Sequence, residues 1–254
     1  MDDSGRLGAV SNSYKPVRNA VVLAAGRGTR MKSLTDDCPK PMLPLAGRPM
    51  LAHQFERFAA AGIRRVCVVI GYRKDMVLDY FAANPPRGIE LSYAVQPEPN
   101  GTAKAALLAK DFAGGSPFLL TFGDIIVDPP VYTKLFELAE GAEMVVALTR
   151  VDDPYRGGAV YVENGLVVRI VEKPPKGTST TNFLCAGVYV FDSKVFGPLE
   201  GLSPSPRGEY DLTDAISQAV REGQTVRCYE VPGFWRDVGR PEDLRPASDY
   251  LGHS

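Results

Sequence analysis

Short apolar runs rich in β-branched residues recur along the first half of the chain and alternate with segments of helical pattern. The runs are NAVVLAAG, RRVCVVIG, IELSYAVQ and PFLLTFGD, and each has the length of a buried strand. Between them, helices are predicted over residues 50–61, 75–82 and 102–112. This alternation predicts a Rossmann-like, three-layer α/β/α fold with a mostly parallel central sheet and helices on both faces.

A different pattern follows in the middle third of the chain. A helix is predicted over residues 131–140, then the strand EMVVALTR, then a β-hairpin in GGAVYVENGLVVRIVEKP that turns at Asn164-Gly165. Residues 210–221 carry one apolar stripe at helical spacing, and Gly223 is placed to end that helix. The central sheet is therefore expected to be mixed, with its antiparallel strands in the middle third.

The chain has 254 residues, of which 44% are hydrophobic, enough for a large α/β domain with a buried core. Residues 1–18 are rich in Gly, Ser, Asn and charge and lack periodicity, which predicts a flexible N-terminal tail. We find no internal repeat and no hexapeptide tract of a β-helix. A single catalytic-sized domain is expected after the tail.

Charge and cysteine usage narrow the possible partners and compartment. A formal net charge of -1 gives no general attraction to nucleic acid or to an anionic membrane. No stretch of about 20 apolar residues is present. The four cysteines are far apart and form no CxxC pair, which is typical of reduced thiols and predicts a cytoplasmic protein. Neither nucleic acid nor a membrane is expected as a partner.

The stretch LAAGRGTRM, residues 23–31, ends the first predicted strand in a basic, glycine-containing loop. Loops at the carboxyl ends of parallel strands are where open α/β sheets bind ligands. Gly26 and Gly28 allow close approach to a phosphate, and Arg27, Arg30 and Lys32 are expected to add positive charge beside it. A dinucleotide fingerprint would need glycine at Met31, and the GK[ST] of a P-loop is missing. A plain glycine turn with solvated arginines is the competing interpretation.

The longer string LAAGRGTRMKSLTDDCPKPMLPLAGRPML resembles the signature of the sugar-1-phosphate nucleotidyltransferases, L-A-[AG]-G-x-G-T-R-[LM] followed by P-K. Further matching motifs follow in order: QPEPNGTAKA, FGD, VEKP, TNFLCAGVYVFDSKV, SPRGEYDLTDAI and WRDVGRPEDL. The chain is most similar to the glucose-1-phosphate thymidylyltransferase and uridylyltransferase branch. The resemblance implies one catalytic domain over residues 19–251, with a nucleotide-binding half (about 19–130) and a sugar-phosphate-binding half (about 131–251).

The implied reaction is attack of a sugar-1-phosphate on the α-phosphorus of a nucleoside triphosphate, with release of pyrophosphate. The second pKa of a phosphate monoester lies near 6, so the attacking oxygen is ionised at pH 7 without a general base. A chain with only two histidines fits such chemistry. Catalysis would come from aligning two anions and neutralising charge at the α-phosphoryl group.

Charge neutralisation predicts Mg²⁺ as the cofactor, held by a few carboxylates and by substrate phosphates. Asp124 in FGD is the first expected ligand, and the resemblance assigns the second to Asp237 in WRDVG. The alternative for both is an ordinary capping or turn aspartate. Asp128, followed by two prolines, is expected to be structural.

The resemblance also assigns the substrate contacts. Arg30 and Lys40 should meet the triphosphate, and Lys173 should pair with the sugar phosphate; these three are the expected catalytic residues. The expected nucleotide-binding residues are Leu23, Ala25, Gly26, Gly28, Thr29, Arg30, Gln96, Gly101, Thr102 and Gly123. The expected sugar-phosphate-binding residues are Gly158, Glu172, Lys173, Gly187 and Glu209.

Gln96 is the residue expected to recognise the base, because its amide complements the O4 and N3-H edge of uracil or thymine. Gly101 is expected to leave room for the ring, so UTP or dTTP is favoured. Users of GTP, ATP or CTP remain open, as does the sugar, because Gly157 stands where the family usually has tyrosine. A cyclitol or phosphonate acceptor also remains possible.

Two other classes are weighed against this assignment. A glycosyltransferase would not need the basic loop, because a nucleotide-sugar has no γ-phosphate. A non-catalytic regulatory homologue typically loses the metal aspartate or the loop arginine, whereas both are present here.

The related thymidylyltransferases continue with a further helical segment after the motif that corresponds to WRDVGRPEDL. Feedback regulation at that segment is therefore not expected for this chain. The oligomeric state, monomer or dimer, stays open.

Overall fold

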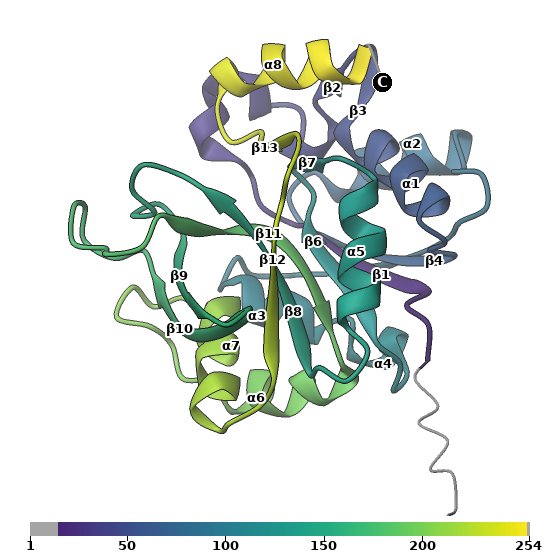
Figure 1. Cartoon of the computed structure of the whole chain (residues 1–254). Coiled ribbons are helices and arrows are strands. Elements are labelled where there is room, and N and C mark those ends of the chain that lie inside the picture. The colour runs from purple at the N-terminus through teal and green to yellow at the C-terminus, as the bar shows by residue number, and fades with distance from the viewer. Residues whose placement is uncertain (1–14, 253–254) are drawn as a thin grey trace, which may run out of the picture.

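The computed structural model describes residues 15–252, which form a nine-stranded sheet flanked by helices (Figure 1). In sheet order the strands are β5 (Glu90–Val95), β4 (Arg65–Ile70), β1 (Asn19–Ala24), β6 (Phe118–Phe122), β11 (Phe183–Phe191), β8 (Met144–Arg150), β12 (Val226–Glu230), β10 (Leu166–Glu172) and β9 (Gly158–Glu163). All four strands predicted in the first half of the chain are present at one end of this sheet.

The sheet is mixed, as the sequence pattern predicts: seven of its nine strands run in one direction, and β10 and β11 run in the other. β1 pairs in parallel with β4 and β6, β4 with β5, and β12 with β8. β11 runs against β6 and β8, and β10 runs against β12 and β9. The predicted hairpin is β9–β10, and it turns through Asn164 (φ 50°) and Gly165 (φ 77°), the left-handed conformations of a tight turn.

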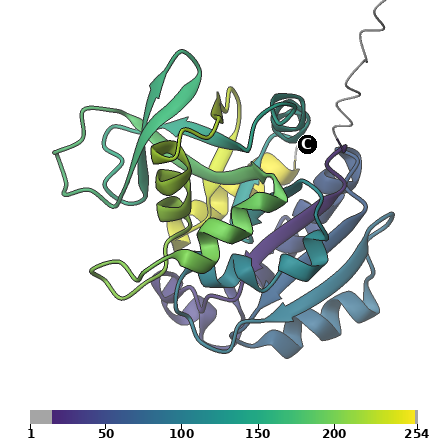
Figure 2. The same cartoon turned by 90° about the horizontal axis from the view of Figure 1, so that it is seen from below.

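Helices cover both faces of the sheet, which gives the predicted three layers. They are α1 (Met50–Ala60), α2 (Lys74–Ala83), α3 (Thr102–Leu107), α4 (Lys110–Ala113), α5 (Pro130–Leu138), α6 (Phe196–Gly201), α7 (Leu212–Arg221) and α8 (Pro241–Gly252). Figure 2 shows the layers from below, with the green helices α6 and α7 side by side.

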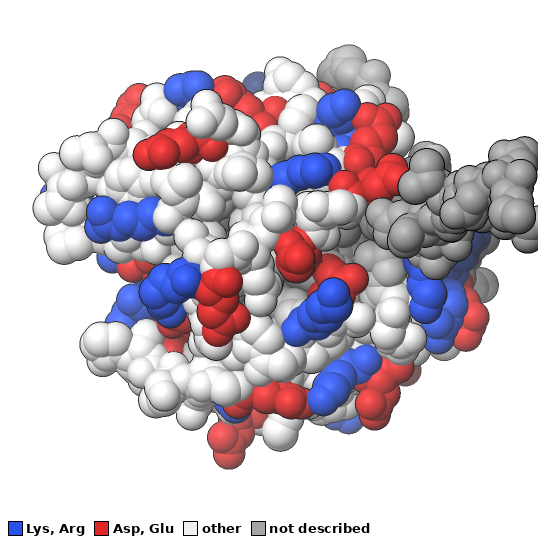
Figure 3. All heavy atoms as spheres, turned by 60° about the horizontal axis from the view of Figure 1, so that its bottom comes forward, with Lys and Arg blue, Asp and Glu red and all other residues white. Residues whose placement is uncertain are grey.

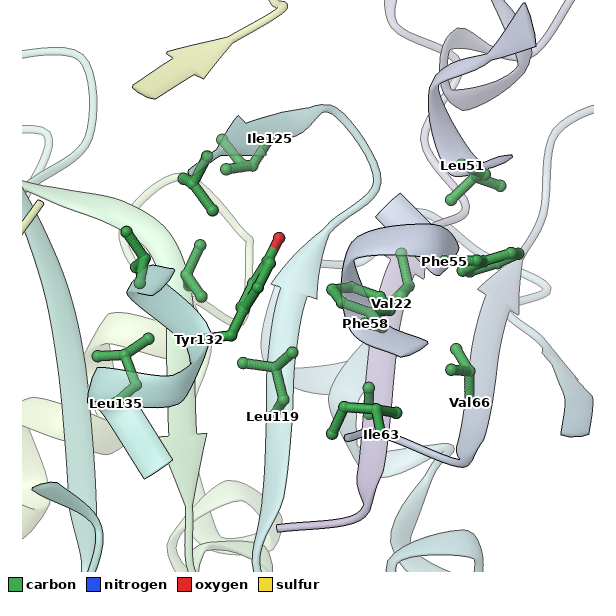
Figure 4. Packing of buried hydrophobic residues seen from close by; sticks show 14 of the residues in the cluster. Val22, Leu51, Phe55, Phe58, Ile63, Val66, Leu119, Ile125, Tyr132 and Leu135 are labelled. Carbon is green, nitrogen blue, oxygen red and sulfur yellow. The ribbon is translucent and has the colours of Figure 1, made fainter. Parts of the chain in front are cut away.

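Alternate side chains of β1 enter two separate cores, because successive side chains of a strand point to opposite faces. Ala20 and Val22 pack with α1, α2 and α5, the cluster drawn in Figure 4. Val21 and Leu23 pack with α3, α6 and α7. A strand that is apolar on both faces is therefore a central strand of the sheet, consistent with the unbroken run NAVVLA.

Two helical predictions need correction. The single helix expected over residues 102–112 is split into α3 and α4, because Ala109 leaves the helical conformation (φ −97°, ψ 9°). The C-terminal helix α8 was not predicted at all. Leu244, Ala247 and Leu251 lie at helical spacing in α8, but Pro246 lies inside the helix, and proline argues against a helix in the sequence. The first turn is capped by the Asp243 carboxylate, which accepts from the Arg240 N–H at 2.9 Å.

A third, smaller core joins α8 to the rest of the molecule. Met31, Leu45, Met50 and Val238 pack there against Ala247 and Leu251 of α8. Two short antiparallel pairs lie beside it: β2 (Pro44–Leu45) with β3 (Arg48–Pro49), and β7 (Ile125–Val127) with β13 (Trp235–Asp237). Three 3₁₀ turns complete the elements, namely η1 (Thr29–Thr35), η2 (Lys40–Met42) and η3 (Ser193–Val195).

Residues 1–14 of the predicted tail lie outside the described residues. Just before β1, Val17 is buried and the Arg18 carbonyl accepts hydrogen bonds from the N–H groups of Arg64 and Arg65. None of the helices between residues 15 and 252 has the length and apolar character needed to cross a membrane. On the face in Figure 3, basic and acidic side chains are interspersed.

Candidate active site

A cavity of about 810 Å³ lies beyond the carboxyl ends of β1, β5 and β6. It is lined by both halves of the chain, including the loop after β1, the segment between β6 and β7, and the base of the β9–β10 hairpin. This is the edge of an open α/β sheet where ligands bind. Every site residue predicted from the sequence lines this cavity except Thr29, which is exposed at the start of η1.

Of the three basic residues in the glycine-containing loop, only one faces the cavity. Arg30 lines the cavity, but Arg27 and Lys32 do not. The Arg27 guanidinium lies 3.4 Å from an Asp36 carboxylate oxygen and 5.4 Å from the centre of the Tyr72 ring. Arg27 is thus engaged in holding the loop against its neighbours.

Gly28 is required by a close approach beneath the loop. It has φ 74°, and a Cβ atom there would lie 2.7 Å from the Cβ of Lys40. A side chain at position 28 would therefore push Lys40 out of its place. Gly26, by contrast, has open space on the side where a Cβ would be, so its backbone is accessible from the cavity.

Asp124 and Asp237 meet at the end of the cavity near Arg30. Asp124 lies between β6 and β7, Asp237 ends β13, and the pairing of β7 with β13 brings them together; the Asp124 carbonyl accepts from the Val238 N–H at 2.9 Å. The Nζ of Lys40, whose side chain is only 8% exposed, contacts Asp124 Oδ2 and lies 3.7 Å from Asp237 Oδ1. One ammonium group is therefore shared by two carboxylates.

The Asp237 carboxyl is in an unfavourable position for an anion. Burial raises its pKa above the ordinary value of 3.8, the charge of Asp124 raises it further, and Lys40 and Arg30 oppose the shift. Asp237 Oδ1 is buried and accepts no hydrogen bond. An additional cation at this point would relieve both the repulsion and the missing partner.

These two carboxylates fit Mg²⁺, which is commonly bound through one or two carboxylates together with phosphates and water. Within residues 15–252, no group of three or more Asp, Glu, His or Cys side chains is placed to hold a metal ion. A metal at Asp124 and Asp237 would therefore depend on further ligands from a bound phosphate.

The cavity is also lined by a second charged cluster. Lys173 follows β10 in the left-handed conformation (φ 43°), and its Nζ lies 3.8 Å from Glu172 Oε1 and 3.7 Å from Glu209 Oε2. Glu172 accepts a 3.0 Å hydrogen bond from the Thr213 hydroxyl, and burial raises its pKa. The predicted sugar-phosphate residues thus come together, although they belong to separate segments.

The two glycines predicted to bind the sugar phosphate are tightly surrounded. A Cβ at Gly158 would lie 3.0 Å from Thr213 Cγ2 and 3.1 Å from Cys185 Sγ. A Cβ at Gly187, which has φ 74°, would lie 2.8 Å from the Phe122 ring. Both glycines therefore allow close packing of the cavity wall itself.

Gln96 lines the cavity, with its Nε2 3.2 Å from Asn100 Oδ1 and 3.3 Å from the Gly101 carbonyl. Gly101 also lines the cavity, and the structure adds a reason for glycine at this position. A Cβ at Gly101 would collide with the backbone of Tyr210, so glycine is needed there for contact between two chain segments. The same contact is reinforced by hydrogen bonds from Ala103 N to the Tyr210 carbonyl and from Leu212 N to Thr102 Oγ1, each 2.9 Å.

Several cavity residues were missed by sequence reasoning. They include Arg156, Asp211, Trp235, Arg236, Arg240 and Asp243. The Trp235 indole N–H donates to the Ala186 carbonyl at 2.8 Å, which fixes β13 against β11. Arg236 and Arg240 stand beside the predicted ligand Asp237, and charged residues so close to a metal ligand were an available signal.

Asp128 is structural, as expected. Its Oδ2 accepts a 2.8 Å hydrogen bond from the Phe234 N–H, and its Oδ1 accepts from the Tyr250 hydroxyl. The Phe234 and Tyr250 rings stack with their centres 3.9 Å apart. These contacts join the segment before β13 to α8, so Asp128 holds the strand that carries Asp237.

The fold is a three-layer α/β/α fold, and its cavity is lined by two charged clusters, Lys40 with Asp124 and Asp237, and Lys173 with Glu172 and Glu209. The chain belongs to the nucleotidyl transferase family, whose model matches residues 19–253. The match confirms the resemblance seen in the ordered motifs.

Curated relatives agree with this membership. The UTP–glucose-1-phosphate uridylyltransferase AglF of Haloferax volcanii is 34% identical over 236 residues, which cover 91% of this chain and 96% of AglF. The bifunctional protein GlmU of Methanococcus maripaludis is 35% identical over 234 residues, 92% of this chain but 54% of GlmU. The chain thus spans about half the length of GlmU-type relatives.

Solved structures have the same fold. A protein assigned as a glucose-1-phosphate thymidylyltransferase of Bacillus anthracis superimposes with a TM-score of 0.84 at 28% identity, over 93% of this chain and 96% of that one. A UDP-glucose pyrophosphorylase in complex with UDP-glucose gives the same TM-score, 0.84, at 25% identity, over 92% of this chain and 98% of that one.

Proposed function

We propose that the chain transfers the nucleotidyl group of UTP or dTTP to a sugar-1-phosphate, giving a nucleotide-sugar and pyrophosphate. The observation that carries the proposal is the convergence of Asp124, Asp237 and Lys40 at one end of the cavity, with Lys173 and Glu209 on its other side. Two separate charged clusters in one cavity fit two anionic substrates that must react with each other.

The residues of the cavity divide into three roles. Arg30 and Lys40 neutralise the triphosphate, and Arg30 stabilises the pyrophosphate as it leaves. Lys173 binds the phosphate of the acceptor, and Glu172 accepts hydrogen bonds from sugar hydroxyls. No residue needs to remove a proton, since the phosphate of the acceptor is already ionised at neutral pH. The chain therefore acts by alignment and charge neutralisation.

Asp124 and Asp237 would hold Mg²⁺, as their shared position and the buried Asp237 Oδ1, which accepts no hydrogen bond, support. When bound, Mg²⁺ supplies charge neutralisation at the α-phosphoryl group and orients its oxygens. Lys40, which is shared between the two carboxylates in the structure, would then be available to the phosphates. The site would be complete only when the triphosphate is present.

The choice of UTP or dTTP rests on the Gln96 amide, which lines the cavity, and on the activities that the names of AglF and of the solved relatives state. The same names make glucose-1-phosphate the first acceptor to test. Gly157, which stands where the family usually has tyrosine, also lines the cavity, so other sugar-1-phosphates are tested beside glucose-1-phosphate. We also place the enzyme in the cytoplasm, since its four cysteines are unpaired.

A substrate grid tests the proposal. Pyrophosphate release with Mg²⁺ would be measured for ATP, CTP, GTP, UTP and dTTP, each with glucose-1-phosphate, N-acetylglucosamine-1-phosphate and mannose-1-phosphate. We expect release with UTP or dTTP and one of the sugars. Release with another triphosphate would show that the proposed base is wrong and would leave the proposed reaction unchanged. Absence of release from every combination, by a protein that binds a triphosphate, would favour a regulatory homologue or a different acceptor such as a cyclitol or phosphonate.

A further inference from the structure

Gln54 is a fully buried amide on the inner face of α1. Its neighbours along the helix include Leu51, Phe55 and Phe58, which Figure 4 shows in the apolar cluster between α1 and the sheet. Burying an amide among apolar side chains is unfavourable unless its polar atoms are hydrogen-bonded. The contacts of Gln54 therefore need an explanation.

The Gln54 Nε2 donates two hydrogen bonds, one of 2.9 Å to the Phe122 carbonyl and one of 2.7 Å to the Ile125 carbonyl. Phe122 is the last residue of β6 and Ile125 the first of β7, so only Gly123 and Asp124 lie between them. The amide orientation is fixed by these partners, because the opposite orientation would place Gln54 Oε1 against two carbonyl oxygens.

The segment between the two carbonyls is otherwise held by its own backbone. The Gly123 N–H donates to the Leu23 carbonyl at 2.9 Å, and the Asp124 carbonyl accepts from Val238. The Ile125 side chain packs in the same cluster as α1 (Figure 4). Gln54 thus ties both ends of the two-residue segment to α1, on the side of the sheet away from the acceptor cluster.

We propose that Gln54 is a positioning residue for the metal-binding carboxylate of Asp124. With both flanking carbonyls fixed, the Asp124 side chain is directed at Lys40 and Asp237, where the proposed function needs it. The inference rests on that proposed function, because it assumes that Asp124 holds a metal ion. Groups that orient a metal ligand from behind typically change metal affinity or activity by about 10- to 100-fold when removed.

The test replaces the amide by a side chain of similar length without donors, Gln54→Met. Mn²⁺ binding is measured by electron paramagnetic resonance in the presence of a UTP analogue that cannot release pyrophosphate. We expect the Mn²⁺ affinity of this complex to fall by about 10-fold or more, with a matching fall in kcat for UTP and glucose-1-phosphate. Affinity for the UTP analogue without metal should stay within about 2-fold of wild type, since Gln54 does not line the cavity.

Phe58→Leu is the matched control. Phe58 lies on the same helix and in the same core but packs on Tyr132, with ring centres 5.3 Å apart. Its substitution should lower the thermal midpoint through lost packing while leaving Mn²⁺ affinity unchanged. Equal losses of metal affinity in Phe58→Leu and Gln54→Met would mean that general core damage is responsible, and would overturn the proposal.

Gln54→Asn keeps the amide but shortens the side chain by one methylene, and it serves if Gln54→Met does not fold. We expect the Mn²⁺ affinity of Gln54→Asn to be lower than that of wild type. If both variants fold, it should be higher than that of Gln54→Met. Wild-type Mn²⁺ affinity in either folded variant would overturn the proposal.

The binding assay needs no acceptor, so it separates this proposal from the proposed function. If the wild-type protein binds Mn²⁺ but releases no pyrophosphate, the proposed function is refuted and the Gln54 comparison stays valid. A wild-type complex that binds no Mn²⁺ would refute both.

Discussion

The Nζ of Lys40 lies 3.7 Å from Oδ1 of Asp237, and the same ammonium contacts Asp124. Two carboxylates from distant parts of the chain thus share one nearly buried cation, which leaves a net negative charge for a metal ion to balance. The arrangement depends on Gly28, because a side chain there would occupy the place of Lys40. The glycine-containing loop therefore has two uses: it exposes backbone at Gly26 and it admits Lys40 to the carboxylate pair.

Lys173→Met should weaken binding of the sugar-1-phosphate and leave binding of UTP unchanged. Removing a charged hydrogen-bond donor is expected to raise the KM for the sugar-1-phosphate by about 10-fold or more, because such bonds contribute about 1.5–3 kcal/mol. The KM for UTP should change by less than about 2-fold. Lys176→Met is the control, since Lys176 follows in the same loop but does not line the cavity. A rise in the KM for UTP equal to that for the acceptor would contradict the assignment.

Gln96→Ala should weaken UTP and dTTP more than GTP, because the lost amide matches the edge of a pyrimidine. The measurement is kcat/KM, or binding of each triphosphate, for wild type and variant. Gln218→Ala, a glutamine on α7 that bonds Glu222 outside the cavity, provides the control. If all triphosphates lose the same factor, Gln96 shapes the pocket without reading the base.

The raised pKa of Asp237 predicts how the stability of the metal-free protein depends on pH. Because the folded protein holds this proton more tightly than the unfolded chain, the Asp237 carboxyl lowers stability progressively as the pH rises from 3.8 through the folded pKa. Asp237→Asn should therefore gain free energy of unfolding relative to wild type over that range. Urea unfolding of both proteins from about pH 3.5 to about pH 8, which spans the titration of carboxylates, gives the comparison. If the difference in free energy of unfolding between the two proteins does not change with pH, the raised pKa of Asp237 is refuted.

Mg²⁺ should reverse this difference in the presence of a UTP analogue. Metal binding requires the ionised carboxylate, so it stabilises wild type more at neutral pH than at acid pH. The free energy of unfolding of Asp237→Asn should rise little when Mg²⁺ is added. Equal stabilisation of the two proteins by Mg²⁺ would remove Asp237 from the metal site.

Gly233→Ala should destabilise the attachment of α8. A Cβ at this position would collide with the Asp128 carboxylate, which holds both Phe234 and Tyr250. We expect a loss of about 1–3 kcal/mol in the free energy of unfolding, as is typical of overpacking. Gly197→Ala is the control, because Gly197 lies in α6 without a left-handed φ, and a Cβ there would meet nothing within 4 Å. Similar stability of the two variants would contradict this account of Asp128.

The fold could be predicted largely from local patterns. The runs around Val22, Val68 and Leu120 are apolar on both faces, and such runs specify buried strands whatever surrounds them. The turn at Asn164-Gly165 is likewise a local signal. Helix α8 has a weaker local signal, because its apolar stripe of Leu244, Ala247 and Leu251 is short and contains Pro246. Its place depends on contacts with Asp128 and Phe234, which are distant in sequence.

The site was predictable where motifs mark backbone shape or charge, and less so where side chains meet from separate elements. Asp124 and Lys173 stand in recognisable strings, and the structure places both on the cavity. Gln54 carries no such signal, because a buried amide on an apolar helix face resembles any core position until its partners are known. Arg27 shows the reverse case, since a loop arginine expected to meet phosphate pairs with Asp36 instead.

The most direct test of the proposed reaction follows the α-phosphate itself. Wild type and Asp124→Asn would be incubated with Mg²⁺, glucose-1-phosphate and UTP radiolabelled in its α-phosphate, with Asp75→Asn as a control at an exposed carboxylate outside the cavity. The account predicts label in a nucleotide-sugar and an equal amount of pyrophosphate for wild type and Asp75→Asn. It predicts a rate at least about 100-fold lower for folded Asp124→Asn. Label recovered in UMP alone, or wild-type transfer by Asp124→Asn, would contradict it.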